Sequence, residues 1–515
     1  MKHVLTKLFG EHEGRVFYPF LIILSLIIAV LLVDQKVFTD NFSALTKWLI
    51  FDFGWAFQVG TFAAILFCFW LMFSSYGSVK LGKPEDKPEF STIAWISMMF
   101  ASSFGLVMWL WYSAEIIYHL FESSRIADMG LTGKPAGVPV ALQSVFMDWG
   151  FHGFALFGIG GLAVALPAYR QGKPMNLAGG LYGILKERSY TSAWGYLTDI
   201  AGALGAFGGT AAAMGLGLTV ISYGIKDLTG VDIGLGPQIG IMLFLVVAFI
   251  ISSVSGVNRG IRILSLVNIY ITAALCVFLF VVGPTNYIFV TITEALGRYI
   301  NYFADFSLWG DAGSVVDGAF KPRGWQNWWL VFYVVWWTSY IPFCGGFVAR
   351  VSKGRSVREF LLGAVIAPMA IAFLCFGAWG STSAFFQITG AVDMYQQIQS
   401  DFGGTIFRLL HELPLASLSI PLVLISSTIY GITTYDSTTY FISMQLSGGQ
   451  LNPKMSMRVL VGALIGAAGL TFLTIGNFNG LKSLGIVAGA PFFLVLMAYM
   501  YSIARMVTMA KRGEF

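Results

Sequence analysis

Charged residues are scarce in this chain of 515 residues, where Asp, Glu, Lys and Arg make up only 11% of the sequence. A soluble globular domain carries about a quarter charged residues, so the composition excludes an ordinary soluble protein. Hydrophobic residues make up 57%, and the mean hydropathy is +0.74. These values predict an all-α protein that crosses a membrane many times. The net charge of +5 does not indicate a nucleic-acid partner, because Lys and Arg gather in short loops between apolar segments.

Cysteine and histidine are also few. The four cysteines all lie inside apolar segments, which argues against a disulfide framework. The five histidines show no HxxxH or HExxH spacing, and the chain contains no Walker motif and no GxGxxG between a strand and a helix. A membrane enzyme would need a metal cluster, a nucleophile with its base, or a cofactor motif. We therefore expect a protein that is not an enzyme and carries no cofactor.

Long apolar runs are what the chain has in abundance. Runs of about 20 residues can cross the hydrocarbon core, and an even number of spans places both termini on one side. Lys and Arg are more frequent in the loops on that side, which predicts that both termini are cytoplasmic. The N-terminal segment lacks a signal cleavage site and is expected to lead into the first span. We predict twelve spans, at about 17–35, 51–75, 92–120, 141–168, 196–222, 237–256, 263–285, 326–349, 359–382, 415–445, 457–475 and 484–508.

Two of these spans carry helix-breaking residues in mid-membrane. The third contains Ser102, Ser103 and Gly105, and the eighth contains Pro342 and the pair 345–346, both glycine. The two lie five spans apart, and an odd number of spans reverses direction, as in transporters built from two inverted repeats. The alternative is that the small residues only allow close helix packing. For either span alone the two interpretations are about equal, and the matched pair favours the transporter.

The expected organisation follows from this pairing. Residues 1–90 form a leader and two peripheral spans, residues 91–285 form the first five-helix repeat, and residues 326–515 form the second repeat with a short tail. Between them, residues 286–325 form an external connector. Ile292, Ala295, Leu296, Tyr299 and Ile300 recur there at helical spacing, which predicts an amphipathic helix along the membrane interface.

The eighth span also carries aromatic residues on adjoining turns. Trp336, Trp337 and Tyr340 precede the predicted break, and basic residues at 350, 353 and 355 end the segment. Aromatic rings at a break in a membrane helix indicate a buried site for a cation, because the ring face attracts positive charge. The basic end is expected to be cytoplasmic.

Several stretches resemble the betaine/carnitine/choline transporter family: WWTSYIPF, FVARVSKGRSVREF, PEFSTIAWISMMFAS, SGVNRGIRILS and GITTYDSTTYF. The resemblance covers essentially the whole chain. It implies two peripheral helices and a five-plus-five inverted-repeat core, commonly assembled as a homotrimer in the bacterial inner membrane. It also implies transport of quaternary ammonium or related onium osmolytes, by symport with sodium or protons or by exchange.

The resemblance also implies a solute site with two aromatic walls. The eighth span supplies the first wall, with Trp336, Trp337 and Tyr340. The fourth span supplies the second wall, with Trp149, Phe154 and Phe157, whose spacing predicts one helical face. Ser103 and Gly105 of the broken third span would lie between the two walls.

Close relatives carry Trp and Tyr at the positions of Phe154 and Phe157. Sulfonium osmolytes such as dimethylsulfoniopropionate therefore also remain candidate solutes.

Asp148 stands directly before Trp149, and a carboxylate within a span is costly and usually faces a cavity or a partner. It could pair with a cationic solute, carry a proton, or bridge to His152. A close Asp148 would repel the carboxylate of a betaine and favour choline-like cations. Against this, relatives specific for choline tend to carry an acid where this chain has Val107. Three further acids, at positions 115, 199 and 436, are expected to be satisfied structural partners.

A sodium site is implied between the third and tenth spans, because sodium prefers oxygen ligands. Its hydroxyls would be Thr433 and Thr434, and carbonyls of Ala101, Phe104 and Tyr430 would complete it. Thr210 and Phe343 match a second sodium position, where Ala206 replaces a hydroxyl. The alternative is that these threonines bond back to their own helix.

Coupling to sodium is the expected mode. Sodium-independent exchangers of the family place a fixed cation where this chain has Asn268, which favours a sodium symporter. A proton-coupled symporter and an exchanger remain alternatives. A channel would not need matched helix breaks with an aromatic site. A non-transporting osmosensor would be expected to carry long charged tails, which this chain does not show.

Overall fold

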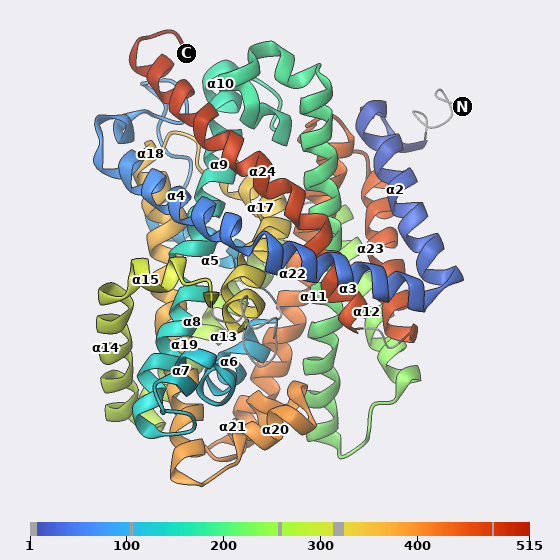
Figure 1. The fold of residues 1–515 in the computed structure, drawn as a ribbon. Coiled ribbons are helices and arrows are strands. Elements are labelled where there is room, and N and C mark those ends of the chain that lie inside the picture. Colours follow the sequence, from blue (N-terminus) through green and yellow to red (C-terminus); the bar gives the residue numbers. More distant parts are fainter. Residues whose placement is uncertain (1–7, 104, 106, 256–259, 313–323, 476–477) are drawn as a thin grey trace.

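The computed structural model describes residues 8–103, 105, 107–255, 260–312, 324–475 and 478–515, and helices dominate these ranges (Figure 1). Eleven helical segments in the described ranges are long and apolar enough to cross a membrane, which confirms the all-α polytopic fold class. Their main helices are α2 (Gly14–Val33), α4 (Gly54–Phe73), α8 (Val138–Asp148) with α9 (Phe151–Gln171), α11 (Ala193–Thr229), α12 (Leu235–Ser255), α13 (Gly260–Val282), α17 (Phe332–Arg350), α19 (Ala367–Thr389), α22 (Ala416–Leu446), α23 (Met455–Ile475) and α24 (Phe478–Lys511).

The third predicted span is divided into two shorter helices, α5 (Thr92–Ser103) and α6 (Met108–Glu122). Gly105 lies between them outside any helix. Each half is too short to cross a bilayer alone, since a span needs about 20 residues. The predicted interruption of this span is therefore confirmed, while the total of twelve spans and the inverted repeat stay predictions.

The predicted break in the eighth span is wrong. Helix α17 runs from Phe332 to Arg350 and includes Pro342 and both following glycines without interruption. The irregular part lies at its beginning, where Asn327–Val331 forms a π-helical turn. Membrane helices tolerate proline and glycine where neighbouring helices pack against them, and most of α17 is buried.

The fourth span is interrupted at a place where no break was predicted. Helix α8 ends at Asp148, and α9 begins at Phe151. Gly150 adopts φ −105° and ψ −139°, and a Cβ at this position would lie 2.3 Å from the carbonyl oxygen of Phe146. Only glycine tolerates such a close approach. As a result, Trp149 lies in a bend between two helices.

Helices α9 and α17 pack through glycines that leave no space for a side chain. A Cβ at Gly153 would lie 2.6 Å from Trp337 Nε1, and one at Gly160 would lie 2.4 Å from Ile341 Cγ2. A Cβ at Gly161 would lie 2.5 Å from Val348 Cγ2. Small residues allow membrane helices to approach closely, so this interface holds the aromatic face of α17 directly against α9.

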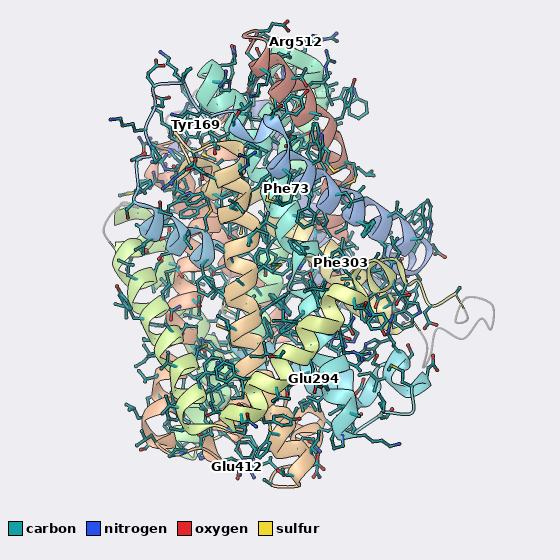
Figure 2. The ribbon with its side chains drawn as sticks, turned by 90° about the vertical axis from the view of Figure 1, so that its left-hand side faces the viewer. Phe73, Tyr169, Glu294, Phe303, Glu412 and Arg512 are labelled. Carbon is teal, nitrogen blue, oxygen red and sulfur yellow. The ribbon has the colours of Figure 1, made fainter. Side chains whose placement is uncertain are left out.

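The connector contains the predicted amphipathic helix as α14 (Thr285–Asn301). Ala295 and Tyr299 are buried, whereas Ile300 is exposed. One further helix was not predicted, α3 (Gln35–Asp52), which joins the first two spans. Figure 2 places Arg512 and Tyr169 toward one end of the molecule, Glu412 at the other end, and Phe73 and Phe303 between them. This distribution suits a protein that crosses a bilayer.

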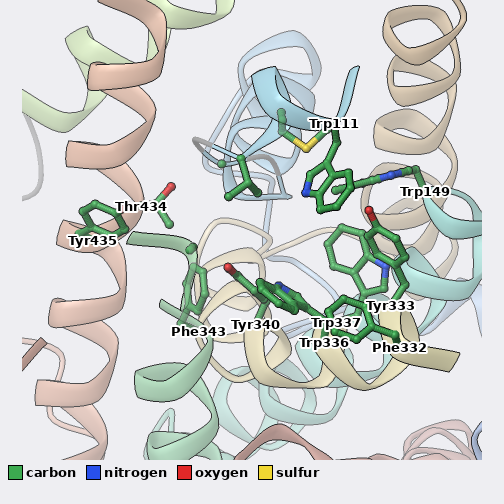
Figure 3. A pocket seen from close by; sticks show the side chains of 14 residues that line it. Trp111, Trp149, Phe332, Tyr333, Trp336, Trp337, Tyr340, Phe343, Thr434 and Tyr435 are labelled. Carbon is green, nitrogen blue, oxygen red and sulfur yellow. The ribbon is translucent and has the colours of Figure 1, made fainter. Parts of the chain in front are cut away.

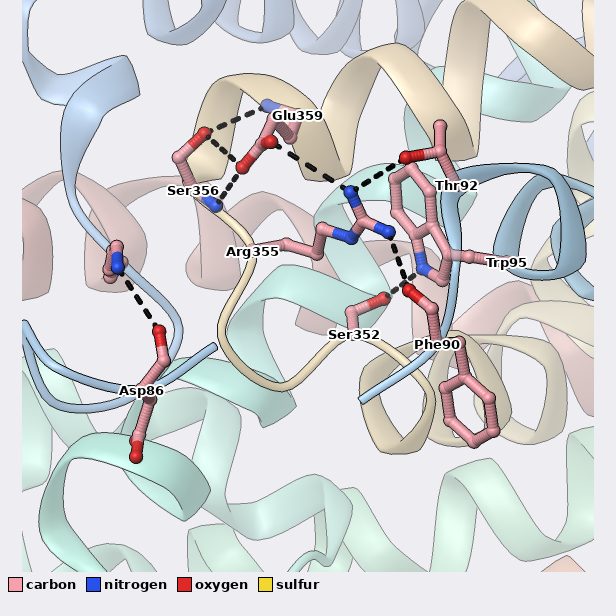
Figure 4. A network of polar contacts seen from close by, with 9 residues as sticks. Asp86, Phe90, Thr92, Trp95, Ser352, Arg355, Ser356 and Glu359 are labelled. Carbon is pink, nitrogen blue, oxygen red and sulfur yellow. Dashed lines mark hydrogen bonds and ion pairs between the residues drawn. The ribbon is translucent and has the colours of Figure 1, made fainter. Parts of the chain in front are cut away.

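A polar network ties the loop after α17 to the beginning of α5 (Figure 4). The guanidinium of Arg355 lies 4.6 Å from the ring centre of Trp95 and donates to the Phe90 carbonyl at 2.9 Å and to Thr92 Oγ1 at 3.3 Å. Trp95 Nε1 donates to Ser352 Oγ at 3.0 Å. The network therefore fixes the first half of the broken third span against the end of α17.

We expect Arg355→Ala to destabilise the protein by about 1–3 kcal/mol, because it removes buried charge-assisted hydrogen bonds and a cation–π contact. Arg355→Lys should recover only part of this loss, since an ammonium cannot reproduce the planar fork. The apparent melting temperature of the detergent-solubilised protein measures the effect. Arg512→Ala, which changes an exposed arginine, is the control. Equal melting temperatures for both alanine variants would contradict the prediction.

Candidate solute site

A cavity lies between the break of the third span, the beginning of α6, helix α17 and helices α11 and α22 (Figure 3). Most of its walls are aromatic rings from α17 and from the bend between α8 and α9. The described part of the lining includes no Lys, Arg, Asp or Glu side chain. The lining residues are Gly105, Val107, Met108, Trp111, Trp149, Ala213, Phe332, Tyr333, Trp336, Trp337, Tyr340, Phe343, Thr434 and Tyr435.

The rings of the cavity pack against one another at fixed angles. The ring centres of Trp149 and Trp337 lie 5.1 Å apart with an interplanar angle of 88°, and those of Trp149 and Tyr333 lie 5.3 Å apart at 65°. Trp336 and Tyr340 are nearly parallel, with centres 6.4 Å apart. Edge-to-face packing leaves ring faces available for a cation. We call Trp149, Tyr333, Trp336, Trp337 and Tyr340 the aromatic cage.

Hydrogen bonds from the polar edges of the rings hold the cage in place. Glu115 Oε2 accepts from both Trp149 Nε1 and the Tyr333 hydroxyl, each at 2.8 Å. Trp337 Nε1 donates to the backbone carbonyl of Asp148 at 3.2 Å. The Tyr340 hydroxyl donates to the carbonyl of Gly209 at 3.2 Å. Because the edges point into the protein, the apolar faces of these rings can form the walls of the cavity.

Most of the predicted solute-binding residues line the cavity: Gly105, Trp149, Trp336, Trp337 and Tyr340 do so together. Two predicted residues, Phe154 and Phe157, do not appear in the lining. They pack behind Trp337, with ring centres 6.1 and 5.2 Å from it. Trp149 also does not share a helical face with them, since it lies before α9. Ser103 ends α5, and its side chain lies outside the described ones.

Sequence reasoning missed several lining residues, of which Tyr333 is the clearest. It lies four residues before Trp337 on α17, and helical spacing would have placed both rings on one face. Trp111 follows the break of the third span and contacts Tyr333 at a ring distance of 6.2 Å. The other missed residues are Val107, Met108, Ala213, Phe332 and Tyr435.

Asp148 is buried beside the cage but faces neither the cavity nor His152. Its Oδ2 atom lies 3.3 Å from His119 Nε2, on α6. His152 Nε2 instead lies 3.0 Å from Ser307 Oγ. The structure thus favours His119 as the partner of Asp148, a contact that the sequence did not indicate because the two residues belong to different spans.

Two helices, α5 and α22, carry the described residues among the predicted sodium ligands. Thr434 lines the cavity, and a Cβ at Gly105 would lie 3.5 Å from Thr434 Oγ1. Thr433 Oγ1 bonds back to the carbonyls of Ile429 and Tyr430 at 2.9 and 3.2 Å, as the alternative interpretation expected. Ala101 belongs to α5, and Phe104 lies outside the described residues.

The candidate second sodium position is also partly visible. Thr210 Oγ1 on α11 lies 3.1 Å from Thr438 Oγ1 on α22, so a second hydroxyl is present although Ala206 is not one. Phe343 lines the cavity and packs 5.6 Å from the Tyr340 ring. Asn268 is a neutral buried acceptor, because Ser426 Oγ donates to its Oδ1 at 2.6 Å.

Comparison with known proteins agrees with this geometry. A model of the betaine/carnitine/choline family of transporters matches residues 15–512. The chain is 32% identical to a glycine betaine transporter of Bacillus subtilis over 474 residues, which cover 92% of this chain and 90% of that protein. It is 30% identical to an ectoine/glycine betaine/proline transporter of Corynebacterium glutamicum, covering 94% and 78% of the two chains.

A further relative is an ectoine/hydroxyectoine transporter of Virgibacillus pantothenticus, which is 27% identical over 96% of this chain and 97% of that protein. The matched family and these named relatives are transporters rather than enzymes. The chain belongs to the betaine/carnitine/choline transporter family.

Proposed function

We propose that this protein is a secondary transporter that imports a methylated onium solute across the bacterial inner membrane. The observation that carries the proposal is the aromatic cage around a cavity at the break of the third span. A quaternary ammonium group cannot donate ordinary hydrogen bonds, so charge and shape must hold it. Ring faces supply both, at about 0.5–2 kcal/mol per desolvated ring.

The relatives support the class of solute. Their names include glycine betaine, ectoine and proline, and each of these compounds joins a positively charged nitrogen-containing group to a carboxylate. The described lining of the cavity holds no basic side chain to bind that carboxylate. Quaternary ammonium compounds of the betaine, carnitine and choline type are the proposed solutes, and a sulfonium analogue such as dimethylsulfoniopropionate would satisfy the same cage.

Sodium is the proposed coupling ion. The Thr434 hydroxyl lines the cavity beside Gly105, and hydroxyl and carbonyl oxygens are the ligands that a hard cation prefers. Ala101, Phe104, Tyr430 and Thr433 are the other proposed ligands of this site. Thr210 and Phe343 are proposed for a second site. To bind the ion, the Thr433 hydroxyl would have to give up its hydrogen bonds to the carbonyls of Ile429 and Tyr430.

Uptake of radiolabelled solute into proteoliposomes tests the function, with glycine betaine, carnitine, choline and dimethylsulfoniopropionate each assayed with and without a sodium gradient. We expect sodium-dependent uptake of at least one of them. Thr434→Val should reduce the sodium affinity at least tenfold, because it removes a ligand oxygen while keeping the shape. Thr428→Val is the matched control, since Thr428 lies on the same helix and bonds back to Leu424.

The other modes of coupling give different results in the same assay. Uptake that follows a proton gradient without sodium would replace sodium with protons as the coupling ion. Exchange of preloaded solute without any gradient would make the protein an exchanger. No uptake of any onium compound would refute the proposed solute class. A homotrimer with cytoplasmic termini is proposed from the family resemblance and the distribution of Lys and Arg.

A further inference from the structure

Behind the aromatic cage lies a cluster of three buried ionisable side chains, Glu115 and His119 on α6 and Asp148 at the end of α8. His119 Nε2 lies 3.3 Å from Asp148 Oδ2 and 3.8 Å from Glu115 Oε1. All three residues are at most 2% exposed. Within the described chain, none of these three facing atoms makes a hydrogen bond. The polar atoms of the cluster therefore interact with one another or bind a small ligand such as a proton.

The hydrogen bond on the far side of His119 fixes its protonation. Trp325 Nε1 donates to His119 Nδ1 at 3.0 Å, and an indole nitrogen can only donate. Nδ1 therefore carries no proton, and the ring is neutral with its proton on Nε2. Nε2 lies 3.3 Å from Asp148 Oδ2 and 3.8 Å from Glu115 Oε1. His119 consequently supplies no positive charge to the cluster, and its Nε2 lone pair is not open to a metal ion.

The two carboxylates differ in their donors. Glu115 accepts two hydrogen bonds through Oε2, from Trp149 Nε1 and from the Tyr333 hydroxyl. Asp148 has the single N–H of His119 beside it. Two buried carboxylates that share one neutral donor cannot both stay ionised at low cost, because like charges in a low-dielectric site repel. Asp148, with fewer donors, is the residue that would hold a proton.

No neighbouring helix supplies a compensating charge in the described chain. On α17, Tyr333 is a neutral donor to Glu115. On α14, Arg298 donates to Gln143, and Tyr299 accepts from the backbone N–H of Phe151. On α9, His152 is turned toward Ser307, and on α19, Cys375 contacts Cys276. The negative charge of Asp148 must therefore be neutralised by a proton or balanced by a cation in the cavity.

The cavity lies one ring away from this cluster. Trp149 follows Asp148 in the chain, lines the cavity with its ring, and donates its N–H to Glu115. Trp337 lines the same cavity and donates to the backbone of Asp148. A positive charge held by the cage would therefore act on Asp148 across a single aromatic layer, and water would screen it little.

We propose that Asp148 holds a proton while the cavity is empty and releases it when an onium cation occupies the aromatic cage. The O–H bond of the Asp148 carboxyl breaks, the proton passes to bulk water, and the carboxylate that remains accepts the His119 N–H. The cation then supplies the positive charge that the proton had supplied. The inference rests on the proposed function, since it needs a cationic solute group in the cage.

Linkage makes the effect reciprocal: if the solute weakens proton binding, the proton weakens solute binding by the same factor. Solute affinity should therefore rise with pH, approaching about tenfold per pH unit where one proton is released. The effect should be larger for choline, which carries a net positive charge, than for glycine betaine, whose carboxylate offsets part of the field.

Calorimetry on the full-length protein in nanodiscs tests this directly. Choline and glycine betaine are titrated in two buffers that differ in ionisation enthalpy, at several pH values. We expect the parent protein to release up to one proton per choline bound, with an affinity that rises with pH. In Asp148→Asn the release should disappear, and the affinity should become independent of pH. Asp199→Asn is the matched control, because Asp199 is also a buried span carboxylate, bonded to Asn176 and Ala178.

Binding of choline by the parent protein without proton release would overturn the inference while leaving the proposed function intact. So would unchanged release in Asp148→Asn. If neither solute binds, the proposed function fails, and infrared spectroscopy of the solute-free protein decides about the proton site. A protonated-carboxyl band that vanishes in Asp148→Asn but persists in Asp199→Asn supports the site, and identical bands in all three proteins refute it. The parent measurement does not depend on the folding of any variant.

Discussion

Trp337→Ala is expected to weaken solute binding on the order of 10- to 100-fold and to abolish measurable uptake. The substitution removes a cage ring worth about 0.5–2 kcal/mol to a cation, together with edge-to-face contacts worth about as much again. Trp337 contacts Trp149 at a ring distance of 5.1 Å and Phe157 at 5.2 Å, so neighbouring rings also lose their support. Equilibrium binding of choline or glycine betaine to the purified protein measures the change.

Two further variants separate the cage from general damage. Trp337→Phe keeps a ring but loses the N–H that bonds to the Asp148 carbonyl, and it should retain part of the affinity. Trp194→Ala changes a tryptophan that is 68% exposed at the beginning of α11, and it should bind as the parent does. If Trp337→Ala bound the solute normally in a folded protein, the aromatic cage would not be the solute site.

Glu115→Ala is expected to cost about 2–5 kcal/mol of stability and to weaken solute binding at the same time. One carboxylate oxygen accepts from both Trp149 and Tyr333, and each buried donor left without an acceptor costs about 1–3 kcal/mol. Both donors belong to cage residues, so the rings would no longer be held in place. The apparent melting temperature and the solute affinity, measured on the same sample, report the two effects.

Glu115→Gln tests whether the hydrogen bonds or the charge matter. A glutamine keeps a carbonyl oxygen that can accept from both donors, and we expect it to recover most of the stability lost in Glu115→Ala. Both variants should fold well enough for a melting curve to be recorded. A Gln variant as unstable as the Ala variant would show that charge, rather than the paired acceptors, holds the cage.

The sequence predicted one of the helix breaks near the site and missed another. Two serines and Gly105 in the third span led correctly to the gap between α5 and α6. Pro342 led to a wrong prediction, because a membrane helix tolerates proline where neighbouring helices pack against it, and α17 continues through this position. The bend at Gly150 was missed, since its cause is the close approach of Phe146 and Tyr299, which no local pattern reveals.

The cage itself was predictable in part. Trp336, Trp337 and Tyr340 stand at helical spacing on one segment, and the family resemblance pointed to Trp149. The contacts that fix these rings join residues far apart in the chain: Tyr333 lies 218 positions from Glu115, and Trp325 lies 206 positions from His119. Such pairings depend on how the spans assemble, so a carboxylate that the sequence marked only as structural became the anchor of two cage rings.

The glycine contacts between α9 and α17 have a mechanical consequence for the transport cycle. Side chains of α17 occupy the space beside Gly153, Gly160 and Gly161 that a Cβ would need, so sliding one helix along the other would bring these side chains against bulkier neighbours. We therefore expect the two helices to move together during transport and to carry Trp337 with them. A change in the shape of the cavity would then come from the opposite wall, where Gly105 separates α5 from α6.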